Sequence, residues 1–179
     1  MEDTEVFAAA RSVLNPVAFE DARLGTFEPH PSVPEFFGQM REWLGAETVF
    51  EVILEPLGPA AREAALAMAR MAWDNREAID TEIREAVTEG VYGERPADIQ
   101  IAVVAEDGTT TTVDDEDERP KLTREQFRTD HKLAKVSCSA RGYCDFHYTV
   151  QNDEWYWSYR ATIMRGEDGG WYLDGWEFP

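Results

Sequence analysis

The stretch that decides the fold is KVSCSARGYCDFHYTVQNDEWYWSYRATIMRGEDGGWYLDGWE, residues 135–177. It contains four runs rich in β-branched and aromatic residues, at 135–140, 143–150, 155–164 and 171–177. Spacers rich in Gly, Asn and Asp separate the runs, and they have the length of hairpin turns. The pattern therefore predicts an antiparallel β-meander of consecutive strands.

Two earlier runs predict a β-hairpin. Residues 36–43 and 48–54 are rich in β-branched and aromatic side chains, and Gly45 lies between them. One face of the second run is the better core candidate, and it carries Thr48, Phe50, Val52 and Leu54. Residues 24–27 predict a short strand, and residues 98–105 predict a strand that enters the sheet.

The segment between these strands predicts helix. Residues 60–90 are rich in Ala, Arg and Glu, and Pro59 suits the first position of a helix. The apolar residues form two stripes at helical spacing, namely Leu66, Ala69 and Trp73, then Ile79, Ile83 and Val87. Asp74 and Asn75 lie between the stripes, so the pattern leaves open one long helix, a kinked helix or a helix pair.

Two shorter helices are also expected. Residues 4–14 have apolar side chains at helix-like spacing and stop at Asn15-Pro16. Thr123 with Gln126 three residues later is a capping-box pattern, which predicts a helix over 124–131 that holds Phe127 inward.

The fold class that these elements indicate is α+β. We expect an antiparallel β-sheet meander packed against a long Ala-rich helix or helix pair, with short N-terminal and mid-chain helices. A chain of 179 residues and 20.4 kDa has the size of one compact domain, so 1–179 is expected to be a single domain. Four Thr at 109–112 precede five acids at 114–118, and we expect an acidic flexible loop at about 106–121.

The charge balance bounds the choice of partner. The chain has 36 Asp and Glu against 17 Lys and Arg, which gives a formal net charge of −19. The acids are spread along the chain, with 18 of them up to Gly90 and 18 after it. Such a surface repels nucleic acid phosphates and anionic membranes. We therefore expect a basic protein partner, no direct nucleic acid binding and no membrane association.

The expected location is the cytoplasm. No apolar run approaches the roughly 20 residues that span a bilayer, and the first residues include acids where a signal peptide carries positive charge. The two cysteines, Cys138 and Cys144, are too few for a disulfide framework and are consistent with a reducing compartment.

Four soft ligands lie close together in the sequence: His131, Cys138, Cys144 and His147. Zinc is the functional hypothesis for this cluster, but Cys144 and His147 are an odd number of residues apart and point to opposite faces of a regular strand. We therefore predict no metal site. A three-residue connection would place Cys138 opposite Cys144, whereas a two-residue turn would put them on opposite faces.

No catalytic residue or cofactor is predicted. Cys144, Asp145 and His147 suggest a nucleophile and a base, but a bulge would be needed to bring the cysteine to that histidine. The chain has no P-loop, no G-x-G-x-x-G, no G-x-S-x-G and no H-E-x-x-H. These absences lower the odds of a common enzyme class.

The run at 155–164 has two faces of different character. Trp155, Trp157, Tyr159, Ala161 and Ile163 share the face that we expect to be core. The other face, together with the neighbouring strand, gives an aromatic and amphipathic surface typical of interfaces. With the acidic run it makes the predicted partner-binding set: Asp114, Asp115, Glu116, Asp117, Glu118, Tyr143, Asp145, His147, Tyr156 and Arg160.

Residues 122–179 resemble an uncharacterised bacterial family, one of the numbered domains of unknown function. The resemblance rests on Leu122-Thr123 to Phe127, the predicted hairpin over 136–148, the Trp-containing strand 155–163 and the turn Asp168-Gly169. The N-terminal part is similar through 24–27, the 43–54 hairpin and the Ala-rich helix with Trp73. Where that family tends to have Gly-His after the strand Trp, this chain has Ser158-Tyr159 after Trp157, so no role of that histidine is carried over.

Some members of that wider group resemble immunity proteins, which neutralise toxins of competing bacteria. The resemblance and the charge together favour an acidic protein-binding domain of immunity or inhibitor type that caps a basic partner such as a nuclease toxin. One alternative is a small-molecule-binding or enzymatic domain, with His147, Asp145 or His131 in a pocket between sheet and helices. Another is a DNA-mimic anti-defence protein.

Overall fold

The computed structural model of the chain describes residues 17–55, 60–93, 100–104, 110–114, 123–152 and 155–178. The elements in chain order are β1 (Phe19–Asp21), β2 (Gly25–Pro29), β3 (Phe36–Trp43), β4 (Ala46–Ile53), α2 (Ala61–Asp74), α3 (Arg76–Tyr92), β5 (Gln100–Val104), β6 (Thr110–Asp114), α4 (Arg124–Thr129), β7 (His131–Ser139), β8 (Tyr143–Asn152), β9 (Trp155–Arg165) and β10 (Trp171–Glu177). The fold class is α+β, as predicted. The helix predicted at 4–14 lies outside the described residues.

Eight strands form one sheet in the order β1-β2-β3-β4-β7-β8-β9-β10. Every neighbouring pair is antiparallel except β4 and β7, which run parallel. A parallel pair needs a crossover connection, and the described helices all belong to the one that joins these two strands. Thr48 helps to join the two halves of the sheet, because its hydroxyl donates to the Leu133 carbonyl at 2.8 Å.

The strands β7 to β10 form the predicted meander, and the Trp-rich strand lies inside the sheet. β9 pairs with β8 on one side and with β10 on the other, so it offers no free edge. In the described part of the chain, β1 and β10 are the two edges. On β9, Tyr159, Ala161 and Ile163 are buried, which confirms the expected core face for the side chains that the structure describes.

The predicted hairpin at 36–54 is confirmed, and its turn is tighter than the sequence pattern indicated. β3 and β4 pair from Phe36↔Ile53 to Trp43↔Ala46, so only Leu44 and Gly45 connect them. Both residues have positive φ, 52° and 78°, as a type I′ turn requires. The four side chains of the predicted core face are buried: Thr48, Phe50, Val52 and Leu54.

The Ala-rich segment forms two helices of 14 and 17 residues, and not one long helix. The break falls at Asn75, whose backbone N–H and side-chain amide both donate to the Met71 carbonyl, at 3.1 and 2.8 Å. Because these bonds satisfy a carbonyl in the last turn of α2, they stabilise the end of the helix at this position. The carbonyl of Asn75 then accepts from Ile79 as α3 begins.

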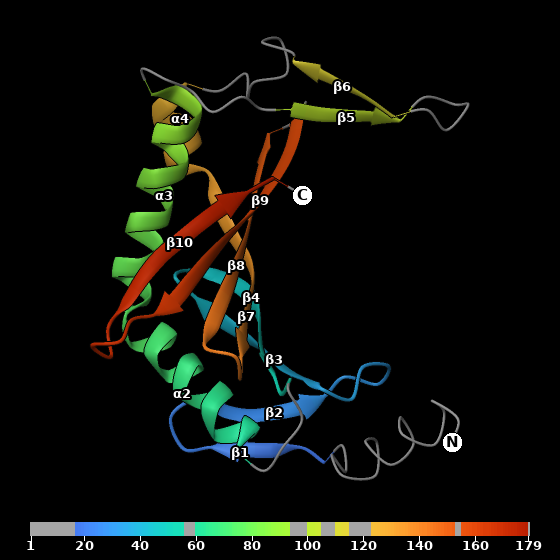
Figure 1. Cartoon of the computed structure of the whole chain (residues 1–179), viewed down its shortest axis with the longest axis vertical. Coiled ribbons are helices and arrows are strands. Elements are labelled where there is room, and N and C mark those ends of the chain that lie inside the picture. The colour runs from blue at the N-terminus through green and yellow to red at the C-terminus, as the bar shows by residue number, and fades with distance from the viewer. Residues whose placement is uncertain are drawn as a thin grey trace.

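The helices cover one face of the sheet, and the core lies between these layers (Figure 1). α2 packs against β4, β7 and β8, whereas α3 contacts α4 and β10. The contact with β10 is close, since a Cβ on Gly90 would lie 2.1 Å from the Trp176 ring. The predicted capping box at Thr123 and Gln126 is present, and Phe127 is fully buried.

One expectation for the middle of the chain is wrong. The strand predicted at 98–105 is β5, but it pairs with β6 in a separate two-stranded sheet and does not enter the main one. β6 itself lies within the predicted loop at 106–121, so part of that loop is strand. Its Thr-rich sequence explains this outcome, because β-branched Thr favours extended backbone even where few apolar side chains are present.

Candidate protein interface

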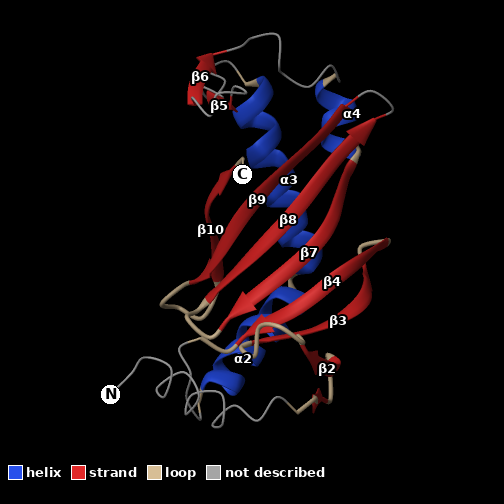
Figure 2. Cartoon of the chain, turned by 90° about the vertical axis from the view of Figure 1, so that its right-hand side faces the viewer, coloured by secondary structure: helices blue, strands red, loops and turns tan. Residues whose placement is uncertain are grey.

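The sheet has a second face that no helix covers in the described part of the chain. Figure 2 views the molecule from this side, with the sheet in front and the helices behind it. We call it the open face. Its side chains alternate with those of the core, and the strands β3, β4, β7, β8, β9 and β10 contribute to it.

The strand register aligns polar side chains in two rows across the open face. In the first row Glu51, Ser137, Asp145 and Thr162 are cross-strand partners on β4, β7, β8 and β9. In the second row Lys135, His147, Arg160 and Glu177 are partners on β7 to β10. Sequence reasoning identified the members on β8 and the arginine on β9. It missed Glu51, because the parallel pairing of β4 with β7 was not foreseen. It missed Lys135, because the length of the β7–β8 connection, which decides the partner of Lys135 on β8, was left open.

Glu51 is the most buried carboxylate of the open face, with 9% of its surface exposed. Its Oε1 accepts a hydrogen bond from the Ser137 hydroxyl at 2.5 Å and lies 3.1 Å from the Lys135 ammonium. A serine that donates to a carboxylate can be a nucleophile with its base. Ser137 is only 3% exposed, however, so its hydroxyl ties β7 to β4 and does not face a substrate.

His147 lies between two cations of the second row. Burial lowers its pKa, and the nearby charges of Lys135 and Arg160 lower it further, against the opposing effect of Asp145 and Glu51. The imidazole is therefore neutral at pH 7. A neutral imidazole can donate one hydrogen bond and accept another, which suits a contact with a polar partner group.

Asp145 and Arg160 belong to a set of charge contacts at the β8–β10 side of the open face. Asp145 Oδ1 accepts from the Thr162 hydroxyl at 2.7 Å, and its Oδ2 lies 3.9 Å from an Arg160 nitrogen. Arg160 also forms an ion pair with Glu177 on the edge strand. These contacts hold the side chains in place from strand to strand, so the surface is preorganised.

The open face also exposes apolar surface and an unfavourable charge pair. Met40 on β3 and Tyr172 on β10 are 56% and 46% exposed. Glu42 and Glu47 are exposed and directly opposite each other near the β3–β4 turn. Like charges in that position destabilise a sheet. Their presence favours a role other than stability for this end of the face.

The helix-facing side of the sheet contains a buried polar network. Tyr148 donates to Asp80 at 2.7 Å, and Arg84 bonds the same carboxylate at 2.8 Å. Tyr159 stacks on Tyr148 with ring centroids 5.0 Å apart, and its hydroxyl lies 2.7 Å from His131 Nδ1. His131 thus lies on the opposite face from His147 and Asp145. The polar groups that the small-molecule alternative offered as candidates therefore do not share one pocket.

Cys138 and Cys144 are cross-strand partners on the helix-facing side, as a three-residue connection requires. Both are buried and free. Burial and the neighbouring Cys138 raise the pKa of the Cys144 thiol well above its usual value, so it remains protonated. Cys144 and His147 lie on opposite faces, and the described residues contain no group of three His, Cys, Asp or Glu able to hold a metal.

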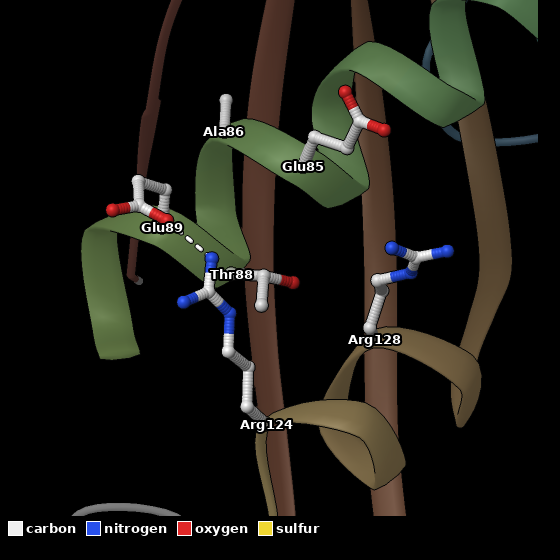
Figure 3. Close-up of a pocket in the computed structure, with 6 residues that line it drawn as sticks. All are labelled: Glu85, Ala86, Thr88, Glu89, Arg124 and Arg128. Atoms are coloured by element: carbon white, nitrogen blue, oxygen red, sulfur yellow. Dashed lines mark hydrogen bonds and ion pairs between the residues drawn. The ribbon is translucent and has the colours of Figure 1, made fainter. Parts of the chain in front are cut away.

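A separate cavity of about 470 Å³ lies between α3 and α4 (Figure 3). Arg124 and Arg128 extend from α4 toward Glu85 and Glu89 on α3, and Arg124 pairs with Glu89. Among the described residues, none forms a hydrogen bond with the Thr88 hydroxyl at this cavity. Since the two cations and two anions of the lining balance, this cavity has no net charge with which to select a ligand.

The structure brings together part of the predicted partner-binding set. Tyr143, Asp145, His147 and Arg160 lie side by side on the open face. The backbone of Asp114 belongs to β6, whereas Asp115, Glu116, Asp117 and Glu118 lie outside the described residues. Tyr156 is on β9, but its side chain is outside the description. Among the described residues, no helix is long and apolar enough to cross a membrane.

Comparison with known proteins adds no relative. No family model, no curated protein and no solved structure matches this chain. The resemblance to the bacterial family of unknown function, and the function that it implies, therefore stay predictions.

Proposed function

We propose that this protein is an acidic protein-binding domain of immunity or inhibitor type, and that its open face caps a basic partner such as a nuclease toxin. The observation that carries the proposal is the open face itself. One side of an eight-stranded sheet is left without a helix in the described chain, yet it exposes Met40 and Tyr172 beside rows of organised charge. Apolar and aromatic side chains rimmed by charged groups are typical of protein interfaces.

The sign of the charge supports a basic partner. Glu42, Glu47, Asp174 and Glu177 are exposed acids on the strands of the open face, and the chain as a whole carries −19. The two cations of the rows, Lys135 and Arg160, are already matched by Glu51 and Glu177. A surface of this kind raises association rates with a cationic protein by roughly 10- to 1,000-fold, with a strong dependence on salt.

The proposal includes a cytoplasmic location, and the two free, buried cysteines are consistent with a reducing compartment. It also favours binding over catalysis. Ser137 is enclosed, and His131 is separated from His147 by the sheet, so the polar groups that could do chemistry are dispersed.

The test compares two variants of equal charge. Glu42→Gln/Glu47→Gln/Glu177→Gln changes exposed acids of the open face, and Glu77→Gln/Glu82→Gln/Glu85→Gln changes exposed acids of α3. Each protein is immobilised, exposed to lysate of the native host at low salt, and eluted with increasing salt. We expect the wild type and the α3 variant to retain the same basic protein, which the open-face variant releases at lower salt.

Two results would contradict the proposal. If no basic protein is retained by the wild type, there is no partner of the stated chemistry. If both variants release the protein at the same reduced salt concentration, then bulk charge and not the open face is responsible.

A further inference from the structure

A shallow cavity of about 340 Å³ lies on the open face, over the strands β8, β9 and β10. Six side chains line it: Tyr143, Asp145, Arg160, Thr162, Met164 and Asp174. Three of them, Tyr143, Asp145 and Arg160, belong to the surface predicted from sequence. The others depend on the register, since Asp145 pairs with Thr162 and Tyr143 pairs with Met164.

The cavity has a net negative charge, because two carboxylates, Asp145 and Asp174, line it with one guanidinium, Arg160. Asp145 Oδ1 is fixed by the Thr162 hydroxyl, but Oδ2 is 3.9 Å from Arg160, which is too long for a hydrogen bond. Arg160 divides its charge between this long ion pair and a closer one with Glu177. Asp174 is exposed at the bulge of β10, and the described chain gives it no ion-pair partner.

The remaining walls suit a flat cation. Tyr143 and Met164 are half-buried cross-strand partners, so an aromatic ring and a thioether lie beside the two carboxylates. A guanidinium group stacks on an aromatic face and presents a fork of N–H donors to carboxylates. An ammonium group is more strongly hydrated and lacks the planar face, so it fits these walls less well.

We propose that this cavity receives an arginine side chain of the basic partner, held by Asp145 and Asp174 and stacked on Tyr143. This inference rests on the proposed function and adds the chemistry of its anchoring contact. Arginine is enriched among the residues that dominate interface energies, and a preformed cavity with a fixed carboxylate is a typical position for such an anchor.

The probe is N-acetyl-arginine amide, titrated into the ¹⁵N-labelled full chain and followed by amide chemical shifts. We expect weak, saturable binding whose shifts centre on the β8–β10 residues of the cavity. N-acetyl-citrulline amide has nearly the same shape without the charge and should bind about 3- to 30-fold more weakly, the range expected from one cation–π contact and one exposed ion pair. N-acetyl-lysine amide should also bind more weakly than the arginine probe.

Variants locate the contact. Asp145→Asn, Asp174→Asn and Tyr143→Leu should each weaken binding of the arginine probe, whereas Glu167→Gln, an equal charge change in the exposed β9–β10 turn, should not. The spectrum of each variant reports whether it is folded. Equal binding of the citrulline or lysine probe, or loss of binding in Glu167→Gln, would overturn the inference.

The outcome separates this inference from the proposed function. If the arginine probe does not bind, while the open-face triple variant still loses the basic partner, then the anchoring contact is wrong and the interface stands. If the probe binds as expected but the host lysate yields no basic partner, the cavity is selective for guanidinium and the proposed function fails.

Discussion

Protonation of His131 should make this protein lose stability in mild acid. The imidazole is 5% exposed, it is surrounded by the rings of Phe127, Tyr148 and Tyr159, and the Arg84 charge is nearby. Burial, with a smaller contribution from Arg84, lowers its pKa from 6.5 to about 3. The fold therefore holds the neutral form, and the unfolded chain takes up a proton first as the pH falls.

The size of the effect follows from these two pKa values. Because the unfolded state binds the proton below pH 6.5 and the folded state only below about pH 3, the free energy of unfolding falls across that window. Between pH 7 and pH 5 the loss is about 2 kcal/mol, and it reaches about 4 kcal/mol at pH 3. A loss of about 2 kcal/mol is a large fraction of the stability of an ordinary domain.

The comparison is with His131→Asn, which keeps a hydrogen-bonding atom near Nδ1 but does not titrate. Urea unfolding at pH 7, 6 and 5, followed by tryptophan fluorescence, gives the free energy for both proteins. The variant should be less stable at pH 7, yet lose about 2 kcal/mol less than the wild type between pH 7 and pH 5. His30→Asn, at an exposed histidine, should follow the wild type.

All carboxylates and His147 are present in both proteins, so their titration cancels in the difference. Equal losses for wild type and His131→Asn between pH 7 and pH 5 would refute the reasoning. It would mean that the folded protein accepts a proton at His131, or at a group coupled to it, despite the ring enclosure.

Two further predictions concern the sheet. Glu42→Lys replaces a like-charge cross-strand pair by a pair of opposite charges, so the free energy of unfolding in urea should rise by about 0.2–1 kcal/mol. The basic partner should elute from this variant at lower salt. A variant less stable than the wild type would contradict the prediction. Gly90→Ala places a Cβ against the Trp176 ring and should lower the free energy of unfolding by about 1–3 kcal/mol. A Cβ at Gly38 would meet only contacts of 3.6 Å, so Gly38→Ala should not have this cost. Equal changes in melting temperature for the two variants would refute the close packing of α3 on β10.

The local elements of this fold were predictable because their signals are local. Alternation placed Thr48, Phe50, Val52 and Leu54 on the core face, and the capping box located α4. The helix break at Asn75 was left open by the pattern, since the bonds that fix it involve the backbone of Met71. The turn at Leu44 was not foreseen, because leucine at positive φ has no sequence signature.

The candidate site was predictable only within one hairpin. Tyr143, Asp145 and His147 share a face by alternation alone, and Arg160 follows from the pairing of consecutive strands. Glu51 joins them only through the parallel register with β7, which relates residues 86 positions apart. Asp174 depends on a bulge in β10, which shifts the register by one residue between Leu173 and Gly175. No periodicity in the sequence marks either feature.

The topology itself explains why this protein has an open face. The connection between β4 and β7 must cross the sheet because the two strands are parallel, and it contains α2, α3 and α4. The other strands of the main sheet are joined without a described helix, mostly by short turns that cannot cover a surface. All the described helices are therefore placed by a single crossover, and α2 and α3 lie on one face.

The opposite face is then free to carry carboxylates, which a helix layer would have to desolvate at high cost. A sheet built this way can hold its core and its partner surface on opposite sides, so substitutions on the open face should change binding with little effect on the core.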